Sequence, residues 1–127
     1  MQRVVMIIDD DEQLRLSVAS ALEAVGFKTV TAGFSQEGLS LAFIEPPDLV
    51  LCDLILPDAV GFETARALTD HPATSNIPII LMTGYPYMRP HGQQSQWRVL
   101  TKPFAMSAML DMVTKAIGFA GGPAPKN

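Results

Sequence analysis

The sequence predicts an α/β domain in which a parallel sheet is covered by helices on both faces. Five short apolar segments alternate along the chain with segments whose apolar residues recur at helical spacing. The apolar segments are continuous runs, which is typical of strands buried on both faces. Regular alternation of strand and helix indicates parallel strands joined by right-handed crossovers. With 127 residues, the chain has the usual size of one domain with one hydrophobic core.

The first predicted strand, Val4–Ile8, is an apolar run that ends abruptly at Asp9, Asp10 and Asp11. A helix follows the aspartates, and Gly26 supplies its C-terminal stop. The apolar residues at helical spacing in this segment are Leu14, Val18, Ala21, Leu22 and Val25. The chain therefore begins with a strand, an acidic turn and a helix.

The same order then repeats. Lys28–Thr31 reads as a short strand, and Ser35 is a predicted N-cap for a second helix that the prolines at 46 and 47 end. The apolar residues of this helix are Leu39, Ala42 and Phe43. A third strand, Leu49–Cys52, runs directly into Asp53.

After a turn at Leu56–Gly61, a third helix is predicted to end before Pro72, and its apolar residues are Phe62, Ala65 and Leu68. A fourth strand, Ile77–Met82, ends at Thr83. Val99–Leu100 forms the centre of a short fifth strand.

The last helix has the clearest pattern, with apolar residues along one face at Met106, Leu110, Val113 and Ile117. Gly118–Asn127 reads as a flexible tail. We therefore expect a domain over residues 1–118, followed by a tail or the start of a linker over 119–127.

Charge and cysteine content limit the function classes. The formal net charge is -4, and no run of Lys or Arg occurs, which argues against direct binding of nucleic acid or an anionic membrane. Cys52 is the single cysteine, so an internal disulfide is excluded. The apolar run Val4–Ile8 is too short for a signal peptide core or a membrane span. A cytoplasmic environment is the simplest interpretation.

Polar side chains follow four of the predicted strands. Asp9 and Asp10 follow the first, Asp53 the third, Thr83 the fourth and Lys102 the fifth. In an open parallel sheet, ligands bind at the carboxyl ends of the strands, where the strand order reverses. We therefore expect these five side chains to converge at one edge of the sheet.

The four segments that contain these strand-end residues resemble, in order and spacing, the signature of the response regulator receiver domain of two-component signalling. The resemblance extends from about Arg3 to Ile117 and rests on joint placement, because each piece alone is weak. It implies a chemotaxis-regulator-like, flavodoxin-like doubly wound sheet with strand order 2-1-3-4-5 and about five helices. The matching segments are Ile8-Asp9-Asp10-Asp11, Asp53-Leu54-Ile55-Leu56-Pro57, Thr83-Gly84 and Lys102-Pro103-Phe104.

The aspartates after the first strand have a simpler interpretation, as caps of the first helix. This suits Asp11 best. It suits Asp9 and Asp10 less well, since two carboxylates about 4 Å apart repel by about 4 kcal/mol at an effective dielectric constant of about 20. A hard divalent cation relieves that repulsion, and an all-oxygen site suits Mg²⁺, with Mn²⁺ as a substitute.

The resemblance also implies a ligand set. Asp10 and Asp53 bind the metal directly, Asp9 acts largely through water, and the backbone carbonyl of Ile55 completes the protein's share. A sensor histidine kinase or a phosphotransfer protein is the implied donor of a phosphoryl group.

The resemblance makes Asp53 the phosphoacceptor, because a carboxylate can attack phosphorus and form an acyl phosphate. Lys102 offers positive charge and Thr83 a hydroxyl donor to the transferred group. The family commonly makes the bond from this lysine to the next residue, here Pro103, cis. The domain would catalyse only its own phosphorylation and dephosphorylation, so we do not expect an enzyme.

Three departures from the family concern the output surface, the part of the domain that would report phosphorylation to partners. Val99 stands where the family often has Tyr or Phe. The segment Gly84–Trp97 is short and contains Pro86, Pro90 and Gly92, so we expect a fourth helix that is shortened or replaced by a loop. One of Tyr85 and Tyr87 is a hypothetical substitute reporter of phosphorylation; the alternative is that both are loop aromatics partly packed on the core. Ala105 lacks the capping side chain that is usual before the last helix.

The alternatives come from other function classes. A pseudo-receiver would use the same fold as an interaction surface without phosphorylation. A phosphohydrolase with Asp53 as nucleophile would need an acid at position 55, which is Ile55. A nucleotide-binding domain would need a glycine-rich loop after the first strand, and none is present. The cognate kinase, an output domain and dimerisation stay open.

Overall fold

The computed structural model describes residues 2–85, 92 and 96–121. Within them, five parallel strands form one sheet in the order β2-β1-β3-β4-β5. The doubly wound sheet and the strand order predicted from the sequence are confirmed. The strands are β1 (Val4–Ile8), β2 (Lys28–Ala32), β3 (Leu49–Asp53), β4 (Ile79–Thr83) and β5 (Arg98–Thr101).

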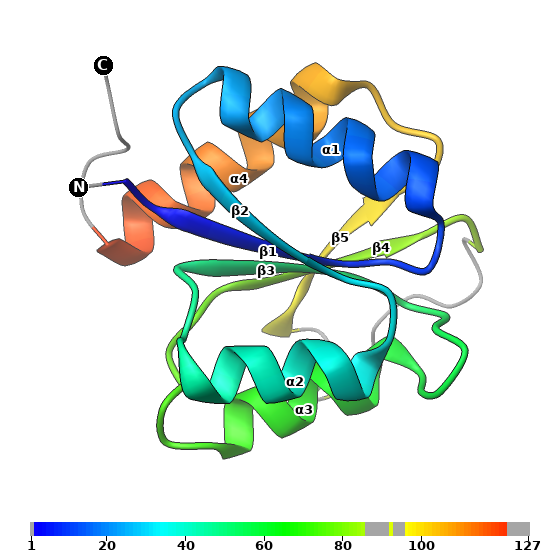
Figure 1. Ribbon diagram of the computed structural model, residues 1–127, viewed down its shortest axis with the longest axis vertical. Coiled ribbons are helices and arrows are strands. Elements are labelled where there is room, and N and C mark those ends of the chain that lie inside the picture. The colour runs from blue at the N-terminus through cyan, green and yellow to red at the C-terminus, as the bar shows by residue number, and fades with distance from the viewer. Residues whose placement is uncertain (1, 86–91, 93–95, 122–127) are drawn as a thin grey trace.

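Helices cover both faces of the sheet. α1 and α4 lie on one face, and α2 and α3 lie on the other (Figure 1). The expectation of a helix between β4 and β5 that is shortened or replaced by a loop concerns residues 84–97, most of which lie outside the described part of the chain. The helices in the described residues are α1 (Glu12–Ala24), α2 (Ser35–Ile44), α3 (Gly61–Asp70) and α4 (Met106–Gly121).

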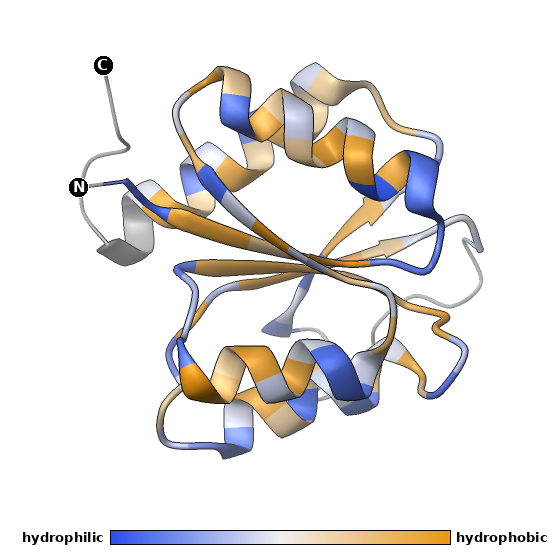
Figure 2. Ribbon diagram, in the orientation of Figure 1, coloured by the Kyte–Doolittle hydropathy of each residue, from blue (hydrophilic) through white to orange (hydrophobic). Residues whose placement is uncertain are grey.

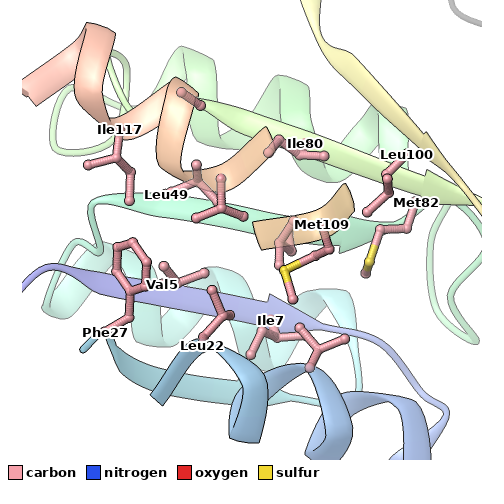
Figure 3. Packing of buried hydrophobic residues seen from close by; sticks show 14 of the residues in the cluster. Val5, Ile7, Leu22, Phe27, Leu49, Ile80, Met82, Leu100, Met109 and Ile117 are labelled. Carbon is pink, nitrogen blue, oxygen red and sulfur yellow. The ribbon is translucent and has the colours of Figure 1, made fainter. Parts of the chain in front are cut away.

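The two faces of the sheet carry two separate hydrophobic clusters, because successive side chains of a strand point to opposite faces. On β1, Val5 and Ile7 pack toward α1 and α4, whereas Met6 and Ile8 pack into the cluster on the α2 and α3 side. Figure 3 shows the first cluster, and Figure 2 shows hydrophobic residues along the central strands. Burial on both faces explains why the strands read as continuous apolar runs.

The register of the strands brings their carboxyl ends to one edge of the sheet. Ile8 pairs with Cys52, Asp53 with Met82, and Thr83 with Thr101. The residues that follow these pairs therefore lie side by side, at the right of the view in Figure 1. This edge holds the polar side chains that the sequence placed at strand ends.

The residues at both ends of α1 have the capping roles predicted from the sequence. The Asp11 side chain accepts a hydrogen bond from the backbone N–H of Leu14 at 3.2 Å, as expected of an N-cap. Gly26 follows the helix with a φ of 102°, a left-handed conformation that glycine adopts without steric cost.

The predicted N-cap of α2 is wrong. Ser35 is the first residue of the helix, the capping position is Phe34, and Phe34 makes no side-chain capping bond. The Ser35 hydroxyl instead pairs with Thr64 Oγ1 at 2.6 Å in the interior. A distant carboxylate, that of Asp58, accepts the N–H groups of Ser35 and Gln36, both at 2.9 Å.

The last helix is longer than predicted. α4 continues through Gly118 to Gly121, because glycine weakens a helix by about 1 kcal/mol relative to alanine without ending it. The start of the predicted tail is therefore helical, and residues 122–127 lie outside the described range. The domain boundary at residue 118 stays a prediction. Among the described residues, no helix has the length and apolar content needed to cross a membrane.

Candidate functional site

Three carboxylates meet at the carboxyl edge of the sheet. Asp9 and Asp10 follow β1, and Asp53 ends β3. One oxygen from each carboxylate lies within 4.8 Å of the others. Asp9 and Asp53 are buried, and Asp10 is exposed. The convergence predicted for these residues is therefore found.

Lys102 joins the carboxylates from the end of β5. Its Nζ lies 3.0 Å from Asp9 Oδ2 and 3.2 Å from Asp53 Oδ2. Its backbone N–H donates to the carbonyl of Thr83 at 2.7 Å, which continues the pairing of β4 with β5. The Lys102–Pro103 peptide bond is cis, as expected. Lys102 is thus a half-buried ion-pair partner of two aspartates.

Burial and charge set the protonation of this cluster. Burial, followed by the negative charge of Asp9, raises the pKa of Asp53 to about 6, while Lys102 opposes the shift. Burial alone would lower the pKa of Lys102, but Asp9 and Asp53 together raise it above its ordinary value. Lys102 therefore carries its charge at neutral pH and offsets part of the repulsion between the carboxylates.

The donor atoms fit a hard divalent cation. Three carboxylates face one ammonium group, so negative charge remains in excess among these side chains. Closely spaced oxygen ligands suit Mg²⁺, which takes oxygen donors and keeps several waters. The nearby thiol of Cys52 is unsuitable, because its Sγ is buried against the carbonyl of Asp53 and burial raises the pKa of the thiol. Asp9, Asp10 and Asp53 are the residues that could hold the cation.

The other predicted site residues lie at the same edge. Thr83 is buried at the end of β4, and its Oγ1 accepts the N–H of Tyr85 at 2.9 Å. Ile55 lies two residues beyond Asp53, and its backbone hydrogen-bonds to the Asp53 carboxylate, which lowers the pKa of that group. The Ile55 side chain is 42% exposed, and the contact of this residue with the site is the hydrogen bond from its backbone.

A closed loop follows the carboxylate of Asp53. Ile55 and Val60 form an antiparallel bridge, and the N–H of Gly61 donates to the carbonyl of Leu54 at 2.6 Å. A Cβ at position 61 would lie 2.6 Å from the carbonyl oxygen of Asp53 and 2.8 Å from the Cα of Leu54. The sequence places Gly61 in a turn but does not reveal this contact. The feature that could have indicated it is a glycine at the end of a turn that follows a strand-end aspartate.

The structure describes some of the residues at which the output surface departs from the family pattern. Val99 is half-buried on β5 and packs against the cluster on the α2 and α3 side. Trp97 is buried, with its ring centroid 6.4 Å from that of Phe62 on α3. Tyr85 is 48% exposed. Tyr87 lies outside the described residues, so the reporter hypothesis stays a prediction.

A known protein family matches most of this chain. The family model described as the response regulator receiver domain matches residues 5–114. The chain belongs to this family. This chain is similar to the phosphate regulon transcriptional regulatory protein PhoB of Pseudomonas aeruginosa, with 36% identity over 81 residues. That match covers 64% of this chain but 35% of PhoB.

Another relative matches along its whole length. The polar-differentiation response regulator DivK of Brucella ovis is 28% identical over 126 residues, which cover 94% of this chain and 100% of DivK. The match with the protein PilH of Pseudomonas aeruginosa, 35% identical over 79 residues, covers 62% of this chain and 65% of PilH. The relatives therefore include proteins of receiver length and longer proteins.

Solved structures share the fold. The chemotaxis response regulator CheY4 of Vibrio cholerae superposes with a TM-score of 0.84 and 24% identity, covering 91% of this chain and 99% of CheY4. The receiver domain of a sensor histidine kinase from Pseudomonas aeruginosa, solved with a magnesium ion coordinated in its active site cleft, has a TM-score of 0.81 and 18% identity. That comparison covers 93% of this chain and 99% of the other.

Replacing Gly61 by alanine should lower the free energy of unfolding by about 1–3 kcal/mol. The reason is that both atoms in the way of the new Cβ belong to the backbone and cannot rotate aside. Urea denaturation measures the change. Gly118→Ala is the matched control: nothing lies within 4 Å of a Cβ there, so the helix should gain about 1 kcal/mol. Equal stability of Gly61→Ala and wild type would contradict the contact.

Proposed function

We propose that Asp53 accepts a phosphoryl group from the phosphohistidine of a sensor histidine kinase or phosphotransfer protein, in a Mg²⁺-dependent reaction. The observation that carries this proposal is the position of Asp53 beside two further carboxylates and 3.2 Å from the Lys102 ammonium. Phosphorylation then changes the surface that the domain presents to its partners. We further propose that the receiver domain extends to the end of α4 at Gly121, three residues beyond the boundary at 118 expected from the sequence, and that a linker to an output domain begins after it.

The proposed step is a displacement at phosphorus. An oxygen of the Asp53 carboxylate forms the new O–P bond as the P–N bond to the donor histidine breaks, and the electron pair of that bond stays on the imidazole nitrogen. Lys102 pairs its charge with the phosphoryl oxygens. The Thr83 hydroxyl accepts the N–H of Tyr85 and still has its own proton to donate to the phosphoryl group.

The proposed metal ligands are the Asp10 and Asp53 carboxylates and the backbone carbonyl of Ile55, with Asp9 acting through water. Bound Mg²⁺, or Mn²⁺ in its place, supplies positive charge to the phosphoryl oxygens. The magnesium ion in the receiver domain of the Pseudomonas aeruginosa sensor kinase supports this choice of metal.

The chain acts as a signalling domain in the cytoplasm rather than as a turnover enzyme. Position 55 holds an isoleucine, which cannot protonate a leaving group as a phosphohydrolase requires. Hydrolysis of the phosphoaspartate returns the domain to its starting state. The acidic net charge of -4 disfavours direct contact with nucleic acid, so we infer that any effect on transcription passes through another protein or domain.

Incubation with acetyl phosphate or phosphoramidate and Mg²⁺ should add one phosphoryl group, measured as intact mass. Asp53→Asn should add none, because the amide is a much weaker nucleophile than the carboxylate. Asp48→Asn is the control, since Asp48 binds the N–H of Val4 at the opposite edge of the sheet and should leave phosphorylation unchanged. An unmodified wild type would favour the pseudo-receiver.

Millimolar Mg²⁺ should raise the melting temperature at neutral pH, because a ligand that binds only the native state stabilises it. At a Mg²⁺ concentration one hundred times Kd, the expected gain is about 2.7 kcal/mol. Thermal unfolding followed by circular dichroism measures the shift. Asp10→Asn should reduce the response and Asp48→Asn should keep it. A wild-type melting temperature that does not change with Mg²⁺ concentration would contradict the proposed metal site.

A further inference from the structure

The loop between Asp53 and α3 is attached to a helix that is distant in the sequence. The carboxylate of Asp58 accepts the N–H of Ser35 through Oδ1 and the N–H of Gln36 through Oδ2, each at 2.9 Å. These N–H groups belong to the first turn of α2, where they have no partner within the helix. One aspartate thus supplies the cap that α2 lacks in its own sequence and ties the loop to α2.

The loop that carries Asp58 has a closed shape. The N–H of Leu56 donates to the carbonyl of Ala59 at 3.0 Å, and Ile55 bridges to Val60. The N–H of Val60 in turn reaches the Glu63 carboxylate at 3.3 Å. The loop is therefore braced internally on both sides of Asp58.

A second contact attaches the same turn of α2 to α3. Ser35 Oγ and Thr64 Oγ1 lie 2.6 Å apart, and both residues are buried. The first turn of α2 is therefore held on two sides, by the loop before α3 and by α3 itself. In this arrangement α2 holds the loop through the exposed side chain of Asp58.

The electrostatics favour the charged form of Asp58. Hydrogen bonds from the backbone of Gln36 and then of Ser35 hold the pKa of Asp58 below its ordinary value. The positive end of the α2 dipole acts in the same direction. The anchor is therefore fully formed at neutral pH.

We propose that Asp58 is a positioning residue for the metal and phosphoryl site. By anchoring the loop to α2, it holds the backbone of Ile55 in place beside Asp53 and thereby raises the affinity for Mg²⁺. This inference rests on the proposed function, since it concerns the same site. Residues that orient a metal ligand without touching the metal typically change metal affinity 10- to 100-fold.

An NMR titration with MgCl₂ at constant pH tests the proposal through the amide signal of Ile55. Asp58→Ala, which removes both acceptors, should weaken Mg²⁺ binding by about tenfold. Asp58→Asn keeps one acceptor oxygen and the shape of the side chain, so its affinity should lie between those of wild type and Asp58→Ala. Asp48→Ala is the matched control, because Asp48 is another exposed aspartate that accepts a backbone N–H, that of Val4 at 2.7 Å. It should bind Mg²⁺ as wild type does.

The outcomes separate this inference from the proposed function. A wild type without Mg²⁺ binding overturns both. Wild-type affinity in Asp58→Ala overturns the positioning role alone, and so does an equal loss in Asp48→Ala, which would indicate general destabilisation. Equal losses in Asp58→Asn and Asp58→Ala would mean that the acceptor oxygen retained in asparagine does not hold the loop, and this also overturns the anchor. Should Asp58→Ala not fold, Asp58→Asn decides: about threefold weaker binding supports the anchor and unchanged binding overturns it.

Discussion

The repulsion among three carboxylates, partly offset by Lys102, is the interaction around which this receiver domain is arranged. Two of the carboxylates, Asp9 and Asp53, are buried, and Lys102 lies within 3.2 Å of both. Such a group of charges is a poor means of stabilising a fold, because desolvation offsets most of the attraction. The parallel register, fixed by apolar packing on both faces, holds the charges together. The stability of the core thus maintains a site that is electrostatically unfavourable without a cation.

The sheet and the main site residues could be predicted because both follow from local features of the chain. Strands buried on two faces need continuous apolar runs, and their ends are marked where a polar residue interrupts the run. Once the strands are known to be parallel, Asp9, Asp53, Thr83 and Lys102 must share one edge. The cap at Asp11 was equally predictable, because its partner, the N–H of Leu14, is three residues away.

What the sequence did not reveal depends on contacts between distant residues. The cap of α2 comes from Asp58, 22 or 23 residues along the chain, so the serine at the expected position is free to bind Thr64. The need for Gly61 follows from the close approach of two backbone segments, of which the sequence shows only a glycine at the end of a turn. The last helix passes through Gly118 because one glycine weakens a helix without ending it. The cap of α2 and the contact at Gly61, in contrast, are decided by tertiary packing rather than by propensity.

Locating the modified residue tests whether Asp53 receives the phosphoryl group. After incubation with phosphoramidate and Mg²⁺, borohydride reduces an aspartyl phosphate to homoserine, and peptide mass spectrometry then identifies the reduced position. We expect homoserine at position 53 and aspartate at positions 9 and 10. Homoserine at another aspartate, or unreduced protein bearing phosphate on a serine, threonine or histidine, would contradict it.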